Sequence, residues 1–241
     1  VDTVEKIADL AVGYTDKIAL AVMGEPLLHP NLVDMVKAIR AKDLNCLLWT
    51  NGQLMTEEKS KSLLKAGVSK VIFSYEIIDK HLHEITRLRA DYDVVMKNLD
   101  DFIRFKDEIS PETEASIWNI VTDTSIPLVF PEHIQQKYQD VELYASYAMD
   151  WHGEIDVGES TEKLNVTPSM CNQIQRYLSV SWEGYFISCC NDFNHEYPIV
   201  NVHEVDSLEQ VLNHQRRLDL MKNMEAGSLS GISPCQTCSA P

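Results

Sequence analysis

Apolar and polar positions along the first 150 residues follow two patterns that repeat in the same order. Short, almost wholly apolar runs such as 17–24 are typical of strands that are buried on both faces. Each run is followed by a segment whose apolar residues recur every three or four positions, which is the pattern of an amphipathic helix. Strands are therefore expected at 17–24, 45–52, 69–76, 114–121 and 141–149, and helices at 3–12, 31–43, after Thr56, at 92–108 and at 131–139.

This alternation of strand and helix predicts the fold class α/β, with a parallel sheet that is either open or curled into a barrel. The alternation stops near residue 155, where a hairpin is expected at 177–188 and one helix at 207–227. The sequence thus predicts two domains, residues 1–155 and 156–241. Because a helix in such a layer normally follows a strand, we expect that a strand upstream of Val1 is absent.

Charge and composition exclude several classes of partner. The chain has 37 acidic against 21 Lys and Arg residues and a net charge of −16, whereas a nucleic-acid-binding protein needs a basic surface. No apolar run approaches the roughly 20 residues that cross a bilayer, and residues 1–14 do not form a signal peptide. We expect a cytoplasmic protein that binds neither nucleic acid nor membrane. Thiols stay reduced there, so clustered cysteines favour metal or redox chemistry over disulfides.

Four of the six cysteines have the spacing of metal ligands. Twelve residues separate Cys171 from Gly184, four more precede Cys189, and Cys235 and Cys238 form a C-x2-C pair. A glycine-turned hairpin would return Cys189 toward Cys171. Four thiolates from two segments can hold a zinc ion or an iron–sulfur cluster, and the spacing alone leaves both open. The other two cysteines, one of them next to Cys189, are interpreted as small core residues.

Glycine and polar residues follow four of the expected strands. G-E-P at 24–26 follows the first, and Asn51, Ser74 and Asn119 stand at the ends of the next three. Parallel sheets bind ligands at the carboxyl ends of their strands. The Glu25 carboxylate suits an ammonium group, and the other three side chains suit hydroxyls and carboxylates. Each motif alone is also a common turn, so the joint placement is what indicates a ligand site.

In these motifs the chain resembles the radical S-adenosylmethionine superfamily, in particular members with a C-terminal twitch or SPASM extension. "GEPLLHPNL" (24–32) is similar to the family's G-G-E-P-L-x-H-P-x-L segment, and "HEITRLRADYDVVMKNLDDF" (83–102) to its I-R-G segment, with Arg87 in the arginine position. "MDWHGEI" (149–155) resembles the W-x-G stretch that closes the barrel. Residues 171–238 resemble the cysteine pattern of a single-cluster twitch tail. The resemblance covers nearly the whole chain.

The resemblance implies a partial (β/α)6 TIM-like barrel, missing its first strand here, and a small C-terminal α+β domain for an auxiliary cluster. It also implies roles for two groups of residues. S-adenosylmethionine would be bound through its amino group, ribose and carboxylate by Gly24, Glu25, Pro26, Asn51, Ser74, Arg87 and Asn119. An auxiliary 4Fe–4S cluster would be ligated by Cys171, Cys189, Cys235 and Cys238.

The sequence departs from the family pattern in two places. Met23 replaces the first glycine of G-G-E-P, and no C-x3-C-x2-C motif occurs in these residues. In the family that motif binds the radical-generating cluster. We interpret the difference as a truncated N-terminus (a GUG start read as Val1 is one route) rather than a degenerate relative. A second 4Fe–4S cluster is expected only where that segment is present, and the polypeptide alone is expected to be inactive.

The resemblance implies that the intact form is a radical SAM oxidoreductase or modifying enzyme. Its 5′-deoxyadenosyl radical would abstract hydrogen from a small-molecule or peptide substrate, and the auxiliary cluster would bind substrate or accept an electron. An external electron donor such as flavodoxin or ferredoxin is implied as well. Asp150 and His152 are candidates for a catalytic base, although a histidine in a surface loop is more often solvated. The alternatives are a partner protein with structural zinc and an electron carrier that retains only the auxiliary cluster.

Overall fold

The structure, a computed structural model, describes most of the chain as two compact units. The described residues are 1–21, 23–74, 76, 80–121, 125–148, 171 and 173–238. The first unit contains residues 1, 3–8 and 15–148, and the second contains residues 2 and 9–14 together with those from 171 onward. The domain boundary expected near residue 155 lies outside the described residues. In the described part of the chain, no helix is long and apolar enough to cross a membrane.

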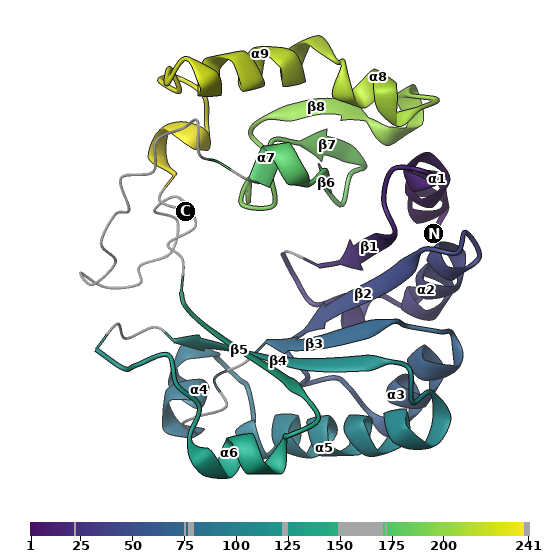
Figure 1. The fold of residues 1–241 in the computed structure, drawn as a ribbon, viewed down its shortest axis with the longest axis vertical. Coiled ribbons are helices and arrows are strands. Elements are labelled where there is room, and N and C mark those ends of the chain that lie inside the picture. The colour runs from purple at the N-terminus through teal and green to yellow at the C-terminus, as the bar shows by residue number, and fades with distance from the viewer. Residues whose placement is uncertain are drawn as a thin grey trace. The chain divides into compact units, whose positions relative to one another are not determined.

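The first unit is built on a five-stranded parallel sheet whose strands lie in chain order. Right-handed crossovers between successive neighbours put all connecting helices on one face, as in a TIM-like barrel rather than a doubly wound sheet. In Figure 1, helices α3, α5 and α6 follow one face of this sheet. The α/β fold class is therefore confirmed. The strands are β1 (Lys17–Leu20), β2 (Asn45–Thr50), β3 (Lys70–Ser74), β4 (Glu114–Val121) and β5 (Glu142–Tyr147).

Local sequence signals explain where the helices of this unit begin. The Thr56 side chain accepts a hydrogen bond from the backbone N–H of Lys59, and Asp91 accepts one from that of Val94, so α3 and α5 start at capped ends. Helix α4 was not expected from the sequence. The helices are α1 (Asp2–Ala11), η1 (Pro26–Leu28), α2 (Leu32–Arg40), α3 (Glu57–Lys65), α4 (Lys80–Thr86), α5 (Tyr92–Ile109) and α6 (Glu132–Lys137).

The core of the first unit lies between the sheet and these helices. Phe73 from β3 and Phe102 from α5 are fully buried, and their rings meet edge to face with centroids 5.4 Å apart. Strand β1 differs from the expectation of a strand buried on both faces, because two of its four residues are exposed. Among the described strands it pairs only with β2, so it is an edge strand of this sheet.

The second unit contains a three-stranded antiparallel sheet in the order β6-β7-β8. Gly184, at φ +86°, turns the expected hairpin between β6 and β7, which is confirmed. The single helix expected at 207–227 is two helices, because His214 has an extended backbone (ψ 135°) that interrupts it. The elements are α7 (Gln173–Arg176), β6 (Ser179–Val180), β7 (Tyr185–Ile187), β8 (Pro198–Asn201), η4 (Val202–Glu204), α8 (Leu208–Leu212), α9 (Gln215–Glu225) and η5 (Cys235–Thr237).

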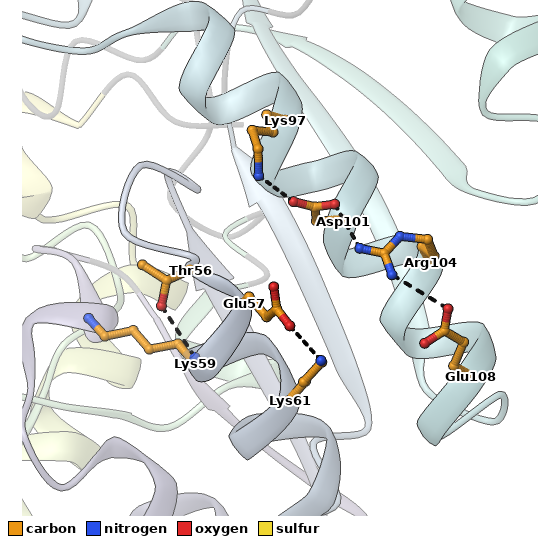
Figure 2. A network of polar contacts seen from close by, with 8 residues as sticks. All are labelled: Thr56, Glu57, Lys59, Lys61, Lys97, Asp101, Arg104 and Glu108. Carbon is orange, nitrogen blue, oxygen red and sulfur yellow. Dashed lines mark hydrogen bonds and ion pairs between the residues drawn. The ribbon is translucent and has the colours of Figure 1, made fainter.

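A row of ion pairs runs along the outer face of α5 (Figure 2). Lys97 donates to Asp101 at 2.6 Å, and Arg104 bridges Asp101 at 3.0 Å and Glu108 at 3.5 Å. These side chains are spaced three or four residues apart, so they lie on one face of the helix. Hydrogen bonds from Lys97 and Arg104 hold the pKa of the Asp101 carboxyl below its ordinary value.

Replacing Asp101 with asparagine is expected to lower the free energy of unfolding by about 0.5–1 kcal/mol at pH 7 and low salt. Because the folded pKa is lowered, this contribution is present above the unfolded pKa of about 3.9 and is lost as the pH falls through the folded value. Urea unfolding of both proteins at pH 7 and near pH 2 measures it. A difference that persists at pH 2, or that 1 M salt leaves unchanged, would show that the ion pairs are not its source.

Candidate cofactor and cluster sites

Glu25, in the segment that follows β1, binds to the end of β2. Its Oε1 accepts hydrogen bonds from the Leu27 N–H at 3.0 Å and the Thr50 hydroxyl at 2.8 Å, and its Oε2 accepts one from the Asn51 N–H at 2.8 Å. A carboxylate offers about four lone-pair positions, so a further donor such as an ammonium group still fits. Gly24, at φ +91°, precedes it, and Pro26 begins η1. The G-E-P segment is thus a fixed turn with a half-buried carboxylate.

Arg87 is held beside the end of β3. Its Nε donates to Glu76 Oε2 at 2.7 Å, and its Nη2 donates to the Ser74 hydroxyl at 3.4 Å. The Glu76 carboxylate is buried and also lies 3.3 Å from Nδ1 of the fully buried His83. Burial lowers the pKa of the His83 imidazole and outweighs the opposing effect of the Glu76 charge. Glu76 therefore compensates mainly the guanidinium of Arg87.

Asn51 and Arg87 line the same cavity in the first unit. Gln53, His83 and Arg89 are also among its lining residues. The Asn51 side chain accepts a hydrogen bond from the Gln53 N–H at 3.0 Å, which fixes its amide at the cavity wall. The cavity therefore combines two guanidinium groups with neutral amides, a set of donors that suits a carboxylate.

The structure connects four of the residues predicted to bind the cofactor. Glu25 contacts Asn51, Asn51 shares the cavity with Arg87, and Arg87 contacts Ser74. Asn119 is buried in β4, next to the position paired with Ser74, and is not among the residues that line this cavity. The two candidates for a catalytic base, Asp150 and His152, lie outside the described residues.

All four predicted cluster cysteines line one cavity in the second unit. Cys171 stands before α7 and Cys189 follows β7, whereas Cys235 and Cys238 stand at the two ends of the single turn η5. The Cys238 N–H donates to the Cys235 carbonyl, a turn that brings the two cysteines of the C-x2-C pair close together. Segments that are far apart in the sequence therefore present their thiols to a common space.

The rest of this cavity is mostly apolar. Ile174 from α7 packs against Leu220 and Met224 from α9, and Cys171 and Cys235 pack against this group. The same three apolar side chains line the cavity, together with Ser188 and Asn191. The thiols of Cys171 and Cys235 thus lie at the edge of a hydrophobic core.

Burial raises the pKa of two of these thiols. It raises the pKa of Cys189 to about 12, helped by the charges of Cys190, Cys238 and Cys171. It likewise raises the pKa of Cys235 to about 12, with contributions from the charges of neighbouring thiols. Thiolates in such surroundings need a positively charged centre to compensate them, and binding of that centre would release their protons.

Across the residues that the structure describes, no three His, Cys, Asp or Glu side chains form an arrangement that could hold one metal ion. The cysteines share a cavity without meeting at a single point. The four cysteine ligands of a 4Fe–4S cluster bind different iron atoms, so they need to reach one space rather than one point. The donor set of four thiols around an apolar cavity therefore fits an iron–sulfur cluster.

Sequence reasoning missed the residues that hold the candidate binding side chains in place. Thr50 binds both the Glu25 carboxylate and the Gly52 N–H, and its position directly before Asn51 was the only signal for it. Glu76 binds Arg87 from 11 residues away. Asp192, buried three residues after Cys189, has no motif of its own.

Two protein-family models match this chain. Residues 1–108 match the Radical SAM superfamily, and residues 171–239 match the iron–sulfur cluster-binding domain called SPASM. The first 108 residues thus carry the radical SAM match, and the tail carries the SPASM match. The cofactors of such domains are S-adenosylmethionine and iron–sulfur clusters. The resemblance inferred from the motifs is thus confirmed, and the SPASM match contains all four cavity cysteines.

One curated relative resembles the barrel part of this radical SAM protein. It is the tungsten-containing aldehyde ferredoxin oxidoreductase cofactor-modifying protein of Pyrococcus furiosus, 28% identical over 108 residues. The match covers 45% of this chain and 29% of the relative, so the chain spans less than a third of that protein.

Solved structures show the same fold at low sequence identity. BtrN in complex with AdoMet and 2-DOIA has a TM-score of 0.58 at 16% identity, covering 99% of this chain and 78% of that one. Native anSMEcpe with bound AdoMet has a TM-score of 0.64 at 14% identity, with 98% and 77% covered. Streptococcus suis SuiB bound to the precursor peptide SuiA has a TM-score of 0.69 at 12% identity, with 91% and 59% covered.

Proposed function

We propose that this radical SAM protein is, in its intact form, an oxidoreductase or modifying enzyme with an auxiliary 4Fe–4S cluster in the second unit. The observation that carries the proposal is the cavity shared by Cys171, Cys189, Cys235 and Cys238. Four thiols beside apolar side chains suit an inorganic centre whose positive charge compensates the thiolates. The SPASM match favours an iron–sulfur cluster over a zinc ion as that centre. The auxiliary cluster would bind the substrate or accept an electron from it.

In the first unit, the strand ends would bind S-adenosylmethionine. The turn at Gly24, Glu25 and Pro26 would hold the methionine ammonium, since the Glu25 carboxylate is fixed by three donors and has room for one more. Arg87, with Ser74 beside it, would bind the methionine carboxylate, because a guanidinium pairs well with a carboxylate. The polar groups of Asn51 and Asn119 would approach the ribose or carboxylate.

Bound S-adenosylmethionine supplies the chemistry of the family, a 5′-deoxyadenosyl radical that abstracts a hydrogen atom from the substrate. A small molecule or a peptide is the proposed substrate, in line with the 2-DOIA and the precursor peptide named with BtrN and SuiB. An electron donor such as flavodoxin or ferredoxin would provide the electron. Because these 241 residues hold no C-x3-C-x2-C motif, they are expected not to cleave S-adenosylmethionine by themselves.

The test is formation of 5′-deoxyadenosine by protein that is expressed from the complete reading frame and loaded with iron and sulfide. Incubation with S-adenosylmethionine and dithionite is expected to yield 5′-deoxyadenosine, and the same protein without reductant is the control. Iron-loaded protein that forms no 5′-deoxyadenosine would contradict the enzyme and leave an electron carrier as the better account.

Replacing Arg87 with alanine is expected to raise the KM for S-adenosylmethionine by roughly 10–100-fold, the loss of one charge-assisted hydrogen-bonding partner. The rate of 5′-deoxyadenosine formation at increasing S-adenosylmethionine concentration measures this effect. Arg104→Ala, on the exposed face of α5, is the matched control and should leave KM unchanged. Equal KM values for the two variants would show that Arg87 does not bind the cofactor.

A further inference from the structure

A buried carboxylate lies beside the cluster cavity and has no role in the ligand set. Asp192 is 1% exposed and follows Cys189 by three residues. An aspartate is rarely buried to this extent unless its oxygens are hydrogen-bonded. Hydrogen-bond donors are therefore expected close to both of its oxygens.

Three donors surround this carboxylate. Oδ2 accepts hydrogen bonds from the Ser188 hydroxyl at 3.1 Å and from the Tyr197 N–H at 3.0 Å, and Oδ1 accepts one from the Glu196 N–H at 2.8 Å. The backbone N–H of Asp192 in turn donates to the Cys189 carbonyl at 3.2 Å. The side chain thus closes the loop 188–197, which carries Cys189, onto itself.

The charge of Asp192 also reaches the cavity. Ser188, which donates to the carboxylate, is one of the cavity-lining residues and adjoins Cys189. The carboxylate is therefore one hydrogen bond away from the lining of the cavity, where a fixed charge acts through a medium of low polarity.

We infer that Asp192 is a positioning residue for Cys189 and that its negative charge lowers the reduction potential of the auxiliary cluster. A reduced cluster carries one more negative charge than the oxidised one, so a fixed carboxylate nearby disfavours reduction. Its hydrogen bonds hold the Cys189 loop in the shape that faces the cavity. The inference rests on the proposed function, because it assumes that the four cysteines ligate a cluster.

The test compares Asp192→Asn with wild type in the 241-residue chain, after anaerobic reconstitution with iron and sulfide. Electron paramagnetic resonance follows the reduced cluster during titration with dithionite and redox mediators. At a fixed ambient potential, the ratio of reduced to oxidised cluster is expected to rise about tenfold in the variant, a shift of about 59 mV for one electron. Asp206→Asn removes an exposed charge from the same unit and should leave the potential unchanged.

Ser188→Ala separates the contact from the charge and serves if Asp192→Asn does not fold. It removes one donor to Asp192 and keeps the carboxylate, so iron release to a chelator should be several-fold faster while the reduction potential does not rise. An unchanged release rate overturns the positioning role. A rise in its potential of about 59 mV, with the carboxylate still present, overturns the role of the charge.

The wild-type chain distinguishes this inference from the proposed function. If wild type binds no iron and sulfide, both the proposed function and this inference are wrong. If wild type holds the cluster while Asp192→Asn and Asp206→Asn give the same potential, the inference alone is wrong.

Discussion

Replacing Cys189 with serine is expected to remove the proposed iron–sulfur cluster of the second unit, whereas replacing its neighbour Cys190 should leave the cluster in place. The variant should retain less than about a tenth of the wild-type iron, because a 4Fe–4S cluster needs all four thiolates of this cavity. Metal binding contributes to folding, so the second unit should also lose stability, on the order of 3 kcal/mol. Cys238→Ser is expected to have the same effect from the other ligand segment.

Cys190 is a matched control because it differs from Cys189 by one position. Its thiol donates to the Gln173 and Asn191 side chains at 3.5 and 3.6 Å, and it is not among the residues that line the cavity. Iron and acid-labile sulfide, determined per chain after anaerobic purification, compare the two variants. Loss of iron from Cys190→Ser with retention in Cys189→Ser would reverse the ligand assignment.

Replacing Gly52 with alanine is expected to destabilise the first unit by about 2–4 kcal/mol and to weaken cofactor binding. Gly52 has φ +75°, which costs a non-glycine residue about 1–2 kcal/mol. A Cβ there would also lie 3.1 Å from the Phe73 ring and 3.2 Å from Val95. Both side chains are fully buried, so neither can move away easily.

The effect should extend to the proposed cofactor site because Gly52 directly follows Asn51. Its N–H donates to Thr50 Oγ1 at 3.0 Å, and its carbonyl accepts from the Asn98 side chain at 2.9 Å. An added methyl group would shift this turn and with it the Asn51 amide at the cavity wall. The KM for S-adenosylmethionine should therefore rise as well, which the 5′-deoxyadenosine assay measures.

Gly67→Ala is the matched control for Gly52→Ala. Gly67 has φ +85° in the same unit, but its Cβ would meet only the flexible Arg40 side chain at an ordinary 3.5 Å. It should show the backbone cost alone and leave the KM unchanged. If urea unfolding gave the same loss for both variants, the close approach of Gly52 to the core would have no energetic consequence.

Elements with a strong local pattern could be predicted from the sequence alone. Strand β4 was expected at 114–121 and forms there, and α3 and α5 begin at the capping residues Thr56 and Asp91. These elements are specified by periodic apolar residues and by their own caps, which are local signals.

Features that depend on neighbours in space could not be predicted. The apolar run at 17–24 indicated a strand buried on both faces, yet β1 is half exposed because it lies at the edge of the described sheet. The break between α8 and α9 depends on the extended backbone at His214. No proline or glycine at this position indicates the break in the sequence. The sequence of a short segment does not determine which other segments pack against it.

The candidate site likewise contains residues that the sequence could predict and residues that it could not. The four cysteines could be selected from the sequence because their spacing is unusual, and they do line one cavity. The residues that hold ligand groups, such as Thr50 with Glu25 and Glu76 with Arg87, depend on contacts between segments 11 to 25 residues apart. Such contacts require the fold, so sequence reasoning had no access to them.

Metal analysis of the anaerobically reconstituted chain tests the central claim most directly, namely that two cysteine pairs bind one iron–sulfur cluster. The account predicts about four iron and four sulfide ions per chain and brown protein with an electron paramagnetic resonance signal after reduction. Colourless protein with about one zinc ion per chain and no acid-labile sulfide would contradict it.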